Sequence, residues 1–293
     1  MTTKEHYIIT NHPCFNESAH HKFGRLHLPV APACNIQCRY CIRKYDCSNE
    51  SRPGVTSKVL TPYEAYERVK HISGRDNHIS VIGIAGPGDP LANEATFETL
   101  ELINKEFPEL ILCLSTNGLL LIDKLKDLLR VGVKSLTITI NAVTTETAEK
   151  IYSKVCYSGY CLDNHEGVRL LLKNQWTGLT LAIEAGLIVK VNTVYIPGIN
   201  DGEIPLIAHD AGKAGANIMN IIPLYPQAEF IHIERPSHEM LNNMRAISRQ
   251  YIPQMTHCRQ CRADALGVLG EDRDMETEML YSILGEEQYD RVC

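Results

Sequence analysis

The chain has 293 residues, with 29 basic and 35 acidic side chains and a formal net charge of −6. Its apolar fraction of 44% and charged fraction of 22% argue against a largely disordered chain. The acidic balance argues against bulk nucleic-acid binding, and no apolar run approaches the roughly 18 residues of a membrane span. Because residues 1–10 also lack a secretory pattern, we expect a cytoplasmic protein without nucleic-acid or membrane partners. Eleven cysteines in a reducing compartment then indicate metal or redox chemistry.

Six β-like runs alternate with amphipathic helical patterns along the chain. The predicted strands are 26–31, 79–85, 110–115, 135–141, 188–195 and 217–223. The predicted helices are 63–72, 93–107, 119–131, 145–152, 163–185, 203–214 and 237–251. From Ala228 onward no further strand pattern is present. This alternation predicts parallel α/β architecture, either a doubly wound sheet or a partial barrel.

The faces of the predicted strands favour the barrel. Leu112 and Leu114 alternate with Cys113 and Ser115, and the first and fourth runs likewise have one leucine-rich face and one smaller, more polar face. A doubly wound sheet tends to be apolar on both faces, whereas a barrel with outer helices can keep a polar lumen. We therefore predict a partial (β/α)6 TIM-like barrel with N- and C-terminal extensions over its mouth, and with His27 and Cys113 pointing into its lumen. A single domain would span residues 1–293, with a core at about 24–223 and a C-terminal extension at 224–293.

The first group of chemically active residues is Cys34-x-x-x-Cys38-x-x-Cys41, directly after the first predicted strand. Three thiolates on one loop can hold three irons of a [4Fe–4S] cluster and leave the fourth iron open. A structural zinc site is the alternative, although it usually takes four ligands in paired motifs. This spacing after a first strand is similar to that of the radical S-adenosylmethionine (SAM) family, in which SAM binds the open iron.

A second motif follows the second predicted strand, at Gly86-Pro87-Gly88-Asp89-Pro90. Glycines here allow the backbone to approach a ligand closely, although a simple turn is the common alternative. The motif resembles the glycine-rich SAM-binding segment of the same family, with Asp89 in place of the usual Glu. The resemblance implies SAM contacts at six positions: Gly86, Gly88, Asp89, Thr139, Asn141 and Asn192.

Longer stretches of the sequence resemble one family within the radical SAM superfamily. Residues 12–14, 30–38, 43–54, 84–90 and 189–192, together with Cys258-x-x-Cys261, are similar to the NifB family of radical SAM maturases. The similarity covers nearly the whole chain. Because many members carry a further C-terminal cofactor-binding domain, this chain resembles the shorter, stand-alone form.

The resemblance implies a reaction in which two [4Fe–4S] clusters are substrates. One SAM donates a methyl group to a sulfide of a substrate cluster, and a radical derived from another SAM abstracts hydrogen from that methyl. The carbon becomes an interstitial carbide while the clusters fuse and gain a sulfur. The product is the eight-iron, nine-sulfur, one-carbon precursor of the nitrogenase iron–molybdenum cofactor.

The same resemblance implies three [4Fe–4S] clusters and their ligands. Cys34, Cys38 and Cys41 would hold the SAM-binding cluster and act in catalysis. His27, Cys47 and Cys113 would hold one substrate cluster, and Cys14, Cys258 and Cys261 the other. Each residue has a simpler interpretation: a strand His is often a hydrogen-bonded core residue, and Cys113 could simply pack. Cys258-x-x-Cys261 alone could be half a zinc site or a redox pair.

Further expectations concern partners and the remaining thiols. The implied partners are a cluster donor, an electron donor and a scaffold or acceptor protein of nitrogenase maturation. Cys156 and Cys161 are expected to be spare loop thiols, and Cys293 to be mobile. Two other functions stay open: a different radical SAM enzyme with auxiliary clusters, and a non-enzymatic iron–sulfur carrier.

Overall fold

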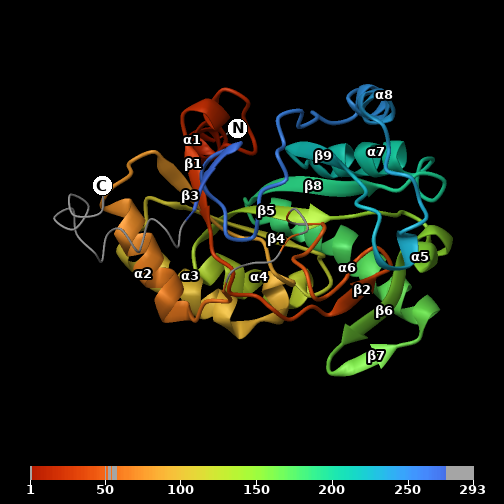
Figure 1. Ribbon diagram of the computed structural model, residues 1–293, viewed down its shortest axis with the longest axis horizontal. Helices are drawn as coiled ribbons and strands as arrows, with labels where there is room; N and C mark the ends of the chain where they lie inside the picture. Colours follow the sequence, from red (N-terminus) through yellow and green to blue (C-terminus); the bar gives the residue numbers. More distant parts are fainter. Residues whose placement is uncertain (1, 50, 52–53, 55–57, 275–293) are drawn as a thin grey trace, which may run out of the picture.

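Six parallel strands, which belong to an eight-stranded sheet, form the centre of the molecule (Figure 1). The structure is a computed structural model that describes residues 2–49, 51, 54 and 58–274; Cys293 lies outside this range. The adjacent strands are, in order, β1 (Gly24–His27), β3 (Ile79–Ile84), β4 (Ile111–Thr116), β5 (Val133–Thr139), β8 (Ile188–Tyr195) and β9 (Ile218–Pro223). Since β1 and β9 do not pair with each other, these strands do not close into a full barrel, which agrees with the predicted partial α/β barrel.

Helices cover the outer face of the sheet, as the leucine-rich strand faces predict. They are α2 (Pro62–Ser73), α3 (Glu94–Glu106), α4 (Leu121–Arg130), α5 (Thr145–Ile151), α6 (Asn164–Glu184), α7 (Ile204–Ala214) and α8 (His238–Ser248). Leu26, Leu112 and Leu136 join helix side chains in the largest apolar cluster. The Thr61 hydroxyl accepts a hydrogen bond from the Glu64 amide, and Pro62 occupies the first turn of α2. Gly132 adopts a positive φ of 84° just after α4, which suits a residue that ends a helix.

The inner face of the sheet is layered along the strands. Ile111, Ile188 and Ile218, the first residues of β4, β8 and β9, form an apolar layer with Ile8, Phe15 and Met255. Two residues further along each strand, the side chains become polar or reactive, because alternate side chains share a face. This middle layer contains His27, Gly83, Cys113, Thr137, Lys190 and Asn220. The polar lumen therefore has an apolar floor.

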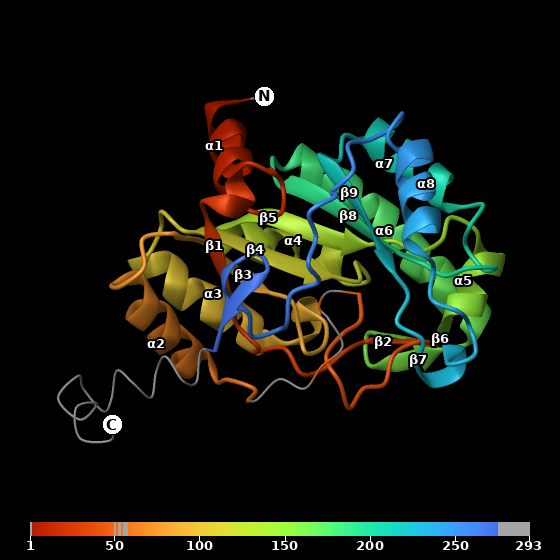
Figure 2. The same cartoon turned by 45° about the horizontal axis from the view of Figure 1, so that its top comes forward.

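Segments at both ends of the described chain provide that floor and one wall (Figure 2). They are α1 (Thr3–Asn11) and a hairpin of β10 (Leu266–Val268) and β11 (Glu271–Arg273). We expected extensions over the barrel mouth, but Ile8 and Phe15 pack against the amino ends of the strands. The apolar layer explains this position, because Ile111, Ile188 and Ile218 would otherwise face water.

The expectation that no strand follows Ala228 is wrong. β10 pairs antiparallel with β1, with Arg25 opposite Gly267 and Leu26 opposite Leu266. A three-residue strand is too short to show periodicity, and the unpaired edge of β1 determines its position. The first predicted strand also ends early, at His27 rather than Ala31, and Pro29 in that stretch has no amide hydrogen to donate.

A second, three-stranded sheet lies beside the first and carries part of the cysteine loop. Its order is β2 (Ile36–Cys38), β6 (Tyr152–Tyr157) and β7 (Tyr160–Leu162). Cys156 and Cys161 pair across the β6–β7 hairpin and form a disulfide, so the expectation of spare thiols is wrong. The hairpin register, which the sequence does not show, brings them together. Within the described part of the chain, no helix is both long and apolar enough to span a bilayer.

Candidate functional site

The three loop cysteines line one cavity at the carboxyl ends of β3 and β4. Cys34, Cys38 and Cys41 face Asp89, which follows β3, and Asn117, which follows β4. Cys38 lies within β2, so pairing with β6 fixes its backbone. The Asn117 side-chain amide donates to Cys34 Sγ over 3.9 Å, and the Asn49 amide donates to Cys38 Sγ over 3.6 Å. The sulfurs are therefore held by a strand and by two amides.

Burial makes these thiols hard to ionise without a cation. It raises the pKa of Cys34 to about 12, with the Asp89 charge adding to the effect. Burial also raises the pKa of Cys38 well above its ordinary value, and the neighbouring Cys41 contributes. For Cys41, burial raises the pKa while the nearby Arg43 guanidinium opposes the increase. Because thiolate is the form that binds metal, a donor set of this kind fits a group with bound iron.

The glycine-rich segment approaches the cysteine loop itself. A Cβ added to Gly88 would lie 2.1 Å from the Ala33 carbonyl oxygen. The amides of Gly88 and Asp89 donate to the carbonyls of Ala31 and Ala33, over 2.5 and 2.8 Å. Glycine at position 88 therefore allows two backbones to meet, and their contact positions the residue that precedes Cys34.

Asp89 holds neighbouring groups in place. Its carboxylate accepts hydrogen bonds from the backbone amide of Asn117 at 2.6 Å, the hydroxyl of Thr116 at 2.9 Å and the backbone amide of Leu91 at 3.0 Å. Burial raises the pKa of Asp89 to about 6, although these bonds oppose the shift. The carboxylate thereby orients Asn117, whose side chain reaches Cys34.

Three other expected SAM contacts, Thr139, Asn141 and Asn192, do not line the cavity that holds the loop cysteines. Asn141 donates to the hydroxyls of Tyr40 and Tyr152 and accepts a bond from the Val194 amide. Thr139 is buried at the end of β5. Asn192 lines a second cavity, where its amide donates to the Asn49 carbonyl over 3.2 Å. SAM contacts at these three residues stay a prediction.

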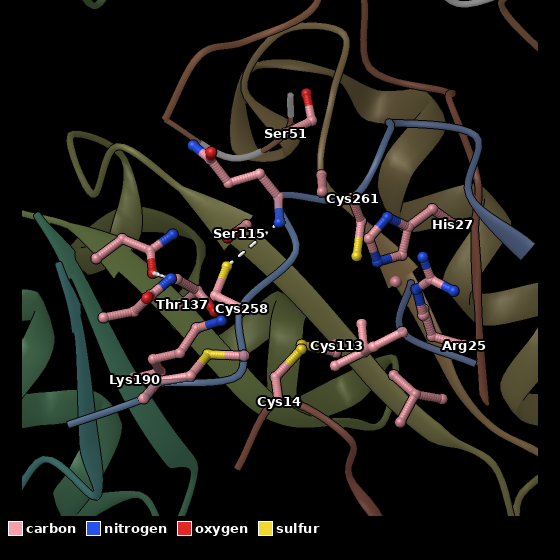
Figure 3. A pocket seen from close by; sticks show the side chains of 18 of the residues that line it. Cys14, Arg25, His27, Ser51, Cys113, Ser115, Thr137, Lys190, Cys258 and Cys261 are labelled. Carbon is pink, nitrogen blue, oxygen red and sulfur yellow. Dashed lines mark hydrogen bonds between the residues drawn. The ribbon is translucent and has the colours of Figure 1, made fainter. Parts of the chain in front are cut away.

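The second cavity, on the inner face of the sheet, collects five of the six predicted substrate-cluster ligands. His27 and Cys113 reach it from β1 and β4, while Cys14, Cys258 and Cys261 reach it from the extensions (Figure 3). The inward orientation of His27 and Cys113 agrees with the prediction from strand alternation. Burial raises the pKa of the Cys14 thiol, Lys190 opposes the shift, and the nearby Cys113 adds to it. One cavity therefore joins residues from both predicted substrate-cluster sites.

His27 presents a lone pair to this cavity. Its Nδ1 lies 2.9 Å from the Arg262 carbonyl oxygen, which can only accept, so the ring proton is on Nδ1 and Nε2 is bare. Burial, and then the charge of Arg25, lowers the pKa of His27 to about 4, which keeps the ring neutral. A Cβ at Gly83 would lie 2.7 Å from His27 Cδ2, so glycine provides the space for the imidazole. A neutral imidazole fixed through one nitrogen is suited to bind metal through the other.

Arg25 connects the cavity to the C-terminal hairpin. Its guanidinium donates to the carbonyls of Gly267 and Val268 over 2.5 and 3.1 Å, and it pairs with Asp272. Burial raises the pKa of Cys261 to about 12, while Arg25 beside it opposes the shift. Arg25 therefore fixes the hairpin and provides positive charge at a predicted ligand. Sequence reasoning missed it, although a basic residue two positions before His27 shares the inner face.

Cys47 is separated from the ligands with which the resemblance groups it. It lines the first cavity, with Cys38 and Cys41, rather than the one that holds His27 and Cys113. Asn49, two residues later, lines both cavities. Among the described residues, no group of three or more His, Cys, Asp or Glu side chains is arranged to hold a single metal ion. A role for Cys47 as a cluster ligand stays a prediction.

The fold and the cysteine loop together define a radical SAM enzyme. Residues 28–211 match the radical SAM superfamily, whose members combine SAM with a [4Fe–4S] cluster. SuiB from Streptococcus suis has a similar fold, with a TM-score of 0.58 and 12% identity over 82% of this chain and 52% of that one.

Closer relatives identify the family within this class. The chain is 48% identical over 276 residues to the FeMo cofactor biosynthesis protein NifB of Klebsiella pneumoniae, covering 92% of this chain and 59% of that protein. It is 45% identical over 271 residues to NifB of Methanocaldococcus infernus, covering 92% of this chain and 89% of that protein. The chain belongs to the NifB family. It spans 59% to 63% of the length of the K. pneumoniae and Chlorobaculum tepidum relatives.

Proposed function

We propose that this chain builds the iron–sulfur core of the nitrogenase cofactor. In this reaction two [4Fe–4S] clusters are fused with a SAM-derived carbide and one further sulfur to give the eight-iron, nine-sulfur, one-carbon precursor. The observation that supports the proposal is the second cavity, where His27 and Cys113 lie with Cys14, Cys258 and Cys261. Two clusters that are to be fused must meet, and these five donors share one cavity.

Each group of residues has a distinct part in the proposal. Cys34, Cys38 and Cys41 would hold a resident [4Fe–4S] cluster, which supplies the electron that cleaves SAM. Arg43 offsets negative charge beside these cysteines, since both Cys34 and Cys41 raise its pKa against burial. Asp89 and Asn117 keep the Cys34 side of the loop in position.

The substrate clusters would be held loosely enough to be rebuilt. Cys14, Cys258 and Cys261 offer three ligands to one cluster, and His27 and Cys113, with Cys47, offer three to the other. Fewer than four protein ligands leave iron open for exchange. Lys190 and Arg25 line the same cavity and bring positive charge to anionic clusters. A cluster donor, an electron donor and an acceptor protein of nitrogenase maturation complete the proposal.

Cysteine variants of the anaerobically reconstituted protein test the assignment. Cys34→Ala should abolish 5′-deoxyadenosine formation from SAM and reductant, because one of three cluster thiolates is gone. Cys113→Ala should keep SAM cleavage and lose precursor formation, measured by activation of cofactor-free nitrogenase. The double variant Cys258→Ala/Cys261→Ala should lose about one cluster's iron and keep SAM cleavage.

The double variant Cys156→Ser/Cys161→Ser is the matched control, because both residues lie in the β6–β7 hairpin outside the two cavities. It should match the wild type in iron content and product. Undiminished SAM cleavage by Cys34→Ala, or an unchanged iron-to-protein ratio in the Cys258/Cys261 variant, would contradict the assignment. A cluster carrier would form no 5′-deoxyadenosine, and a radical SAM enzyme with an organic substrate would form it without the precursor.

A further inference from the structure

His12 is a buried imidazole in the second cavity that the proposed ligand sets do not use. It follows α1 directly, is 3% exposed, and lines the cavity with Cys14, Cys258 and Cys261. Its ring packs edge-on against Phe15, with 4.8 Å between ring centroids. The ring is therefore held on one side by packing, two residues before a predicted cluster ligand.

The hydrogen bonds of His12 fix the position of its proton. The Cys14 backbone amide lies 3.1 Å from His12 Nδ1 and can only donate. Nδ1 therefore carries the lone pair, and the proton of the neutral ring is on Nε2. Among the described residues, this buried Nε2 has no hydrogen-bond partner. A buried donor left unsatisfied costs about 1–3 kcal/mol, so the arrangement is one that a bound acceptor would stabilise.

The two histidines of the cavity therefore offer opposite chemistry. His27 gives its Nδ1 proton to the Arg262 carbonyl and presents a bare Nε2, which is what an iron ligand requires. His12 accepts at Nδ1 and presents N–H at Nε2, which cannot coordinate iron without losing that proton. His12 is thus suited to donate a hydrogen bond, and the sulfurs of an iron–sulfur cluster are the acceptors that this cavity would contain.

We propose that His12 Nε2 donates a hydrogen bond to a sulfur of the cluster held by Cys14, Cys258 and Cys261, and thereby positions that cluster and raises its reduction potential. The inference rests on the proposed function, because it requires the substrate cluster. Hydrogen bonds to cluster sulfurs are among the factors that set reduction potential, since they stabilise the more negative, reduced form. His12 is accordingly a positioning residue and not a ligand.

Two substitutions separate the Nε2 donor from the turn that His12 forms with Cys14. In His12→Asn the side-chain oxygen can still accept the Cys14 amide, as in an Asx-turn, but no donor reaches the place of Nε2. In His12→Gln the longer amide can supply a donor near that place. The variant His21→Asn, at an exposed histidine, is the control. The measurements are iron content, 5′-deoxyadenosine formation and cluster midpoint potentials from an EPR-monitored redox titration of the full-length holoprotein.

The expected result is a selective redox change. His12→Asn should keep the wild-type iron content and SAM cleavage, and should shift the reduction equilibrium of one cluster about tenfold toward the oxidised form, which is 59 mV for one electron. His12→Gln should restore most of this shift, and His21→Asn should show none. Loss of one cluster from His12→Asn but not from His12→Gln would also support the donor role.

Several outcomes would overturn the inference. One is a set of unchanged midpoint potentials in a His12→Asn protein with full iron content. Another is equal loss of a cluster from the Asn and Gln variants, which would assign the effect to packing. The Cys258→Ala/Cys261→Ala protein separates the two proposals: if it keeps all its iron, the substrate-cluster site fails with the inference. If it loses one cluster and His12→Asn changes nothing, only the role of His12 fails.

Discussion

Replacing Gly88 by alanine should damage the site through backbone contact alone. The added Cβ would lie 2.1 Å from the Ala33 carbonyl oxygen and 2.8 Å from that of Pro32. Backbone cannot rotate away as a flexible side chain can, so the two segments must separate by about 1 Å to restore an ordinary contact. The bonds from the Gly88 and Asp89 amides to Ala31 and Ala33 would then stretch or break. Overpacking at about 1–3 kcal/mol and two hydrogen bonds at about 1 kcal/mol each together give a loss of unfolding free energy of about 3–5 kcal/mol.

Denaturant unfolding of the cluster-free chain measures this loss, and reconstituted protein reports its effect on the site. Because Cys34 directly follows Ala33, we expect 5′-deoxyadenosine formation to fall by about a hundredfold, as for a 1 Å misplacement of catalytic groups. Gly202→Ala is the matched control, since a Cβ there meets no atom within 4 Å. Equal stability of the Gly88→Ala and Gly202→Ala proteins would refute the reasoning.

Two further predictions concern pH and the disulfide. Burial raises the pKa of Asp89 to about 6 in the folded chain, whereas its ordinary value is 3.8. The folded state therefore binds the proton more tightly than the unfolded state does. The free energy of unfolding should fall by about 3 kcal/mol as the pH rises from about 4 through 6. Asp89→Asn should remove this decline in the cluster-free protein, and parallel pH profiles for the two proteins would contradict the assignment. Under oxidising conditions, Cys156→Ser/Cys161→Ser should lower the free energy of unfolding by about 2 kcal/mol, since a short loop is no longer closed. Differential alkylation with and without reductant should show these two thiols protected together, and their labelling without reductant would contradict the pairing.

Strand and helix positions were predictable because long elements carry strong periodicity. The predicted run 188–195 coincides with β8, and each of the other five parallel strands overlaps its prediction. The inward orientation of His27 and Cys113 followed from the same alternation. The strands β2, β6, β7, β10 and β11 were missed; four of them have only three residues, and distant partners position β2, which pairs with β6, and β10, which pairs with β1. Pairing over such distances leaves no local pattern in the sequence.

The site was only partly predictable, because motifs name residues but not their contacts. The glycine-rich segment indicated a close approach, and in the structure the approaching group is the Ala33 carbonyl. The resemblance assigned Cys47 to the ligands of His27, whereas the structure places it in the first cavity. The opposite tautomers of His12 and His27 depend on hydrogen bonds to a backbone amide and a carbonyl. Such bonds appear only when the chain is folded.

The cavity at the cysteine loop and the second cavity, on the inner face of the sheet, differ in how much of the chain must be synthesised before each can form. Asn117 and Cys34 are 83 residues apart, so the donors around the cysteine loop come from an early part of the polypeptide. The second cavity instead depends on contacts such as Arg25 with Gly267 and His257 with Pro13, across 242 and 244 residues. Because a polypeptide leaves the ribosome from its amino end, the second cavity can close only after residue 267 has emerged. A ligand that needs both Cys14 and Cys261 can therefore bind only after both of these residues have left the ribosome.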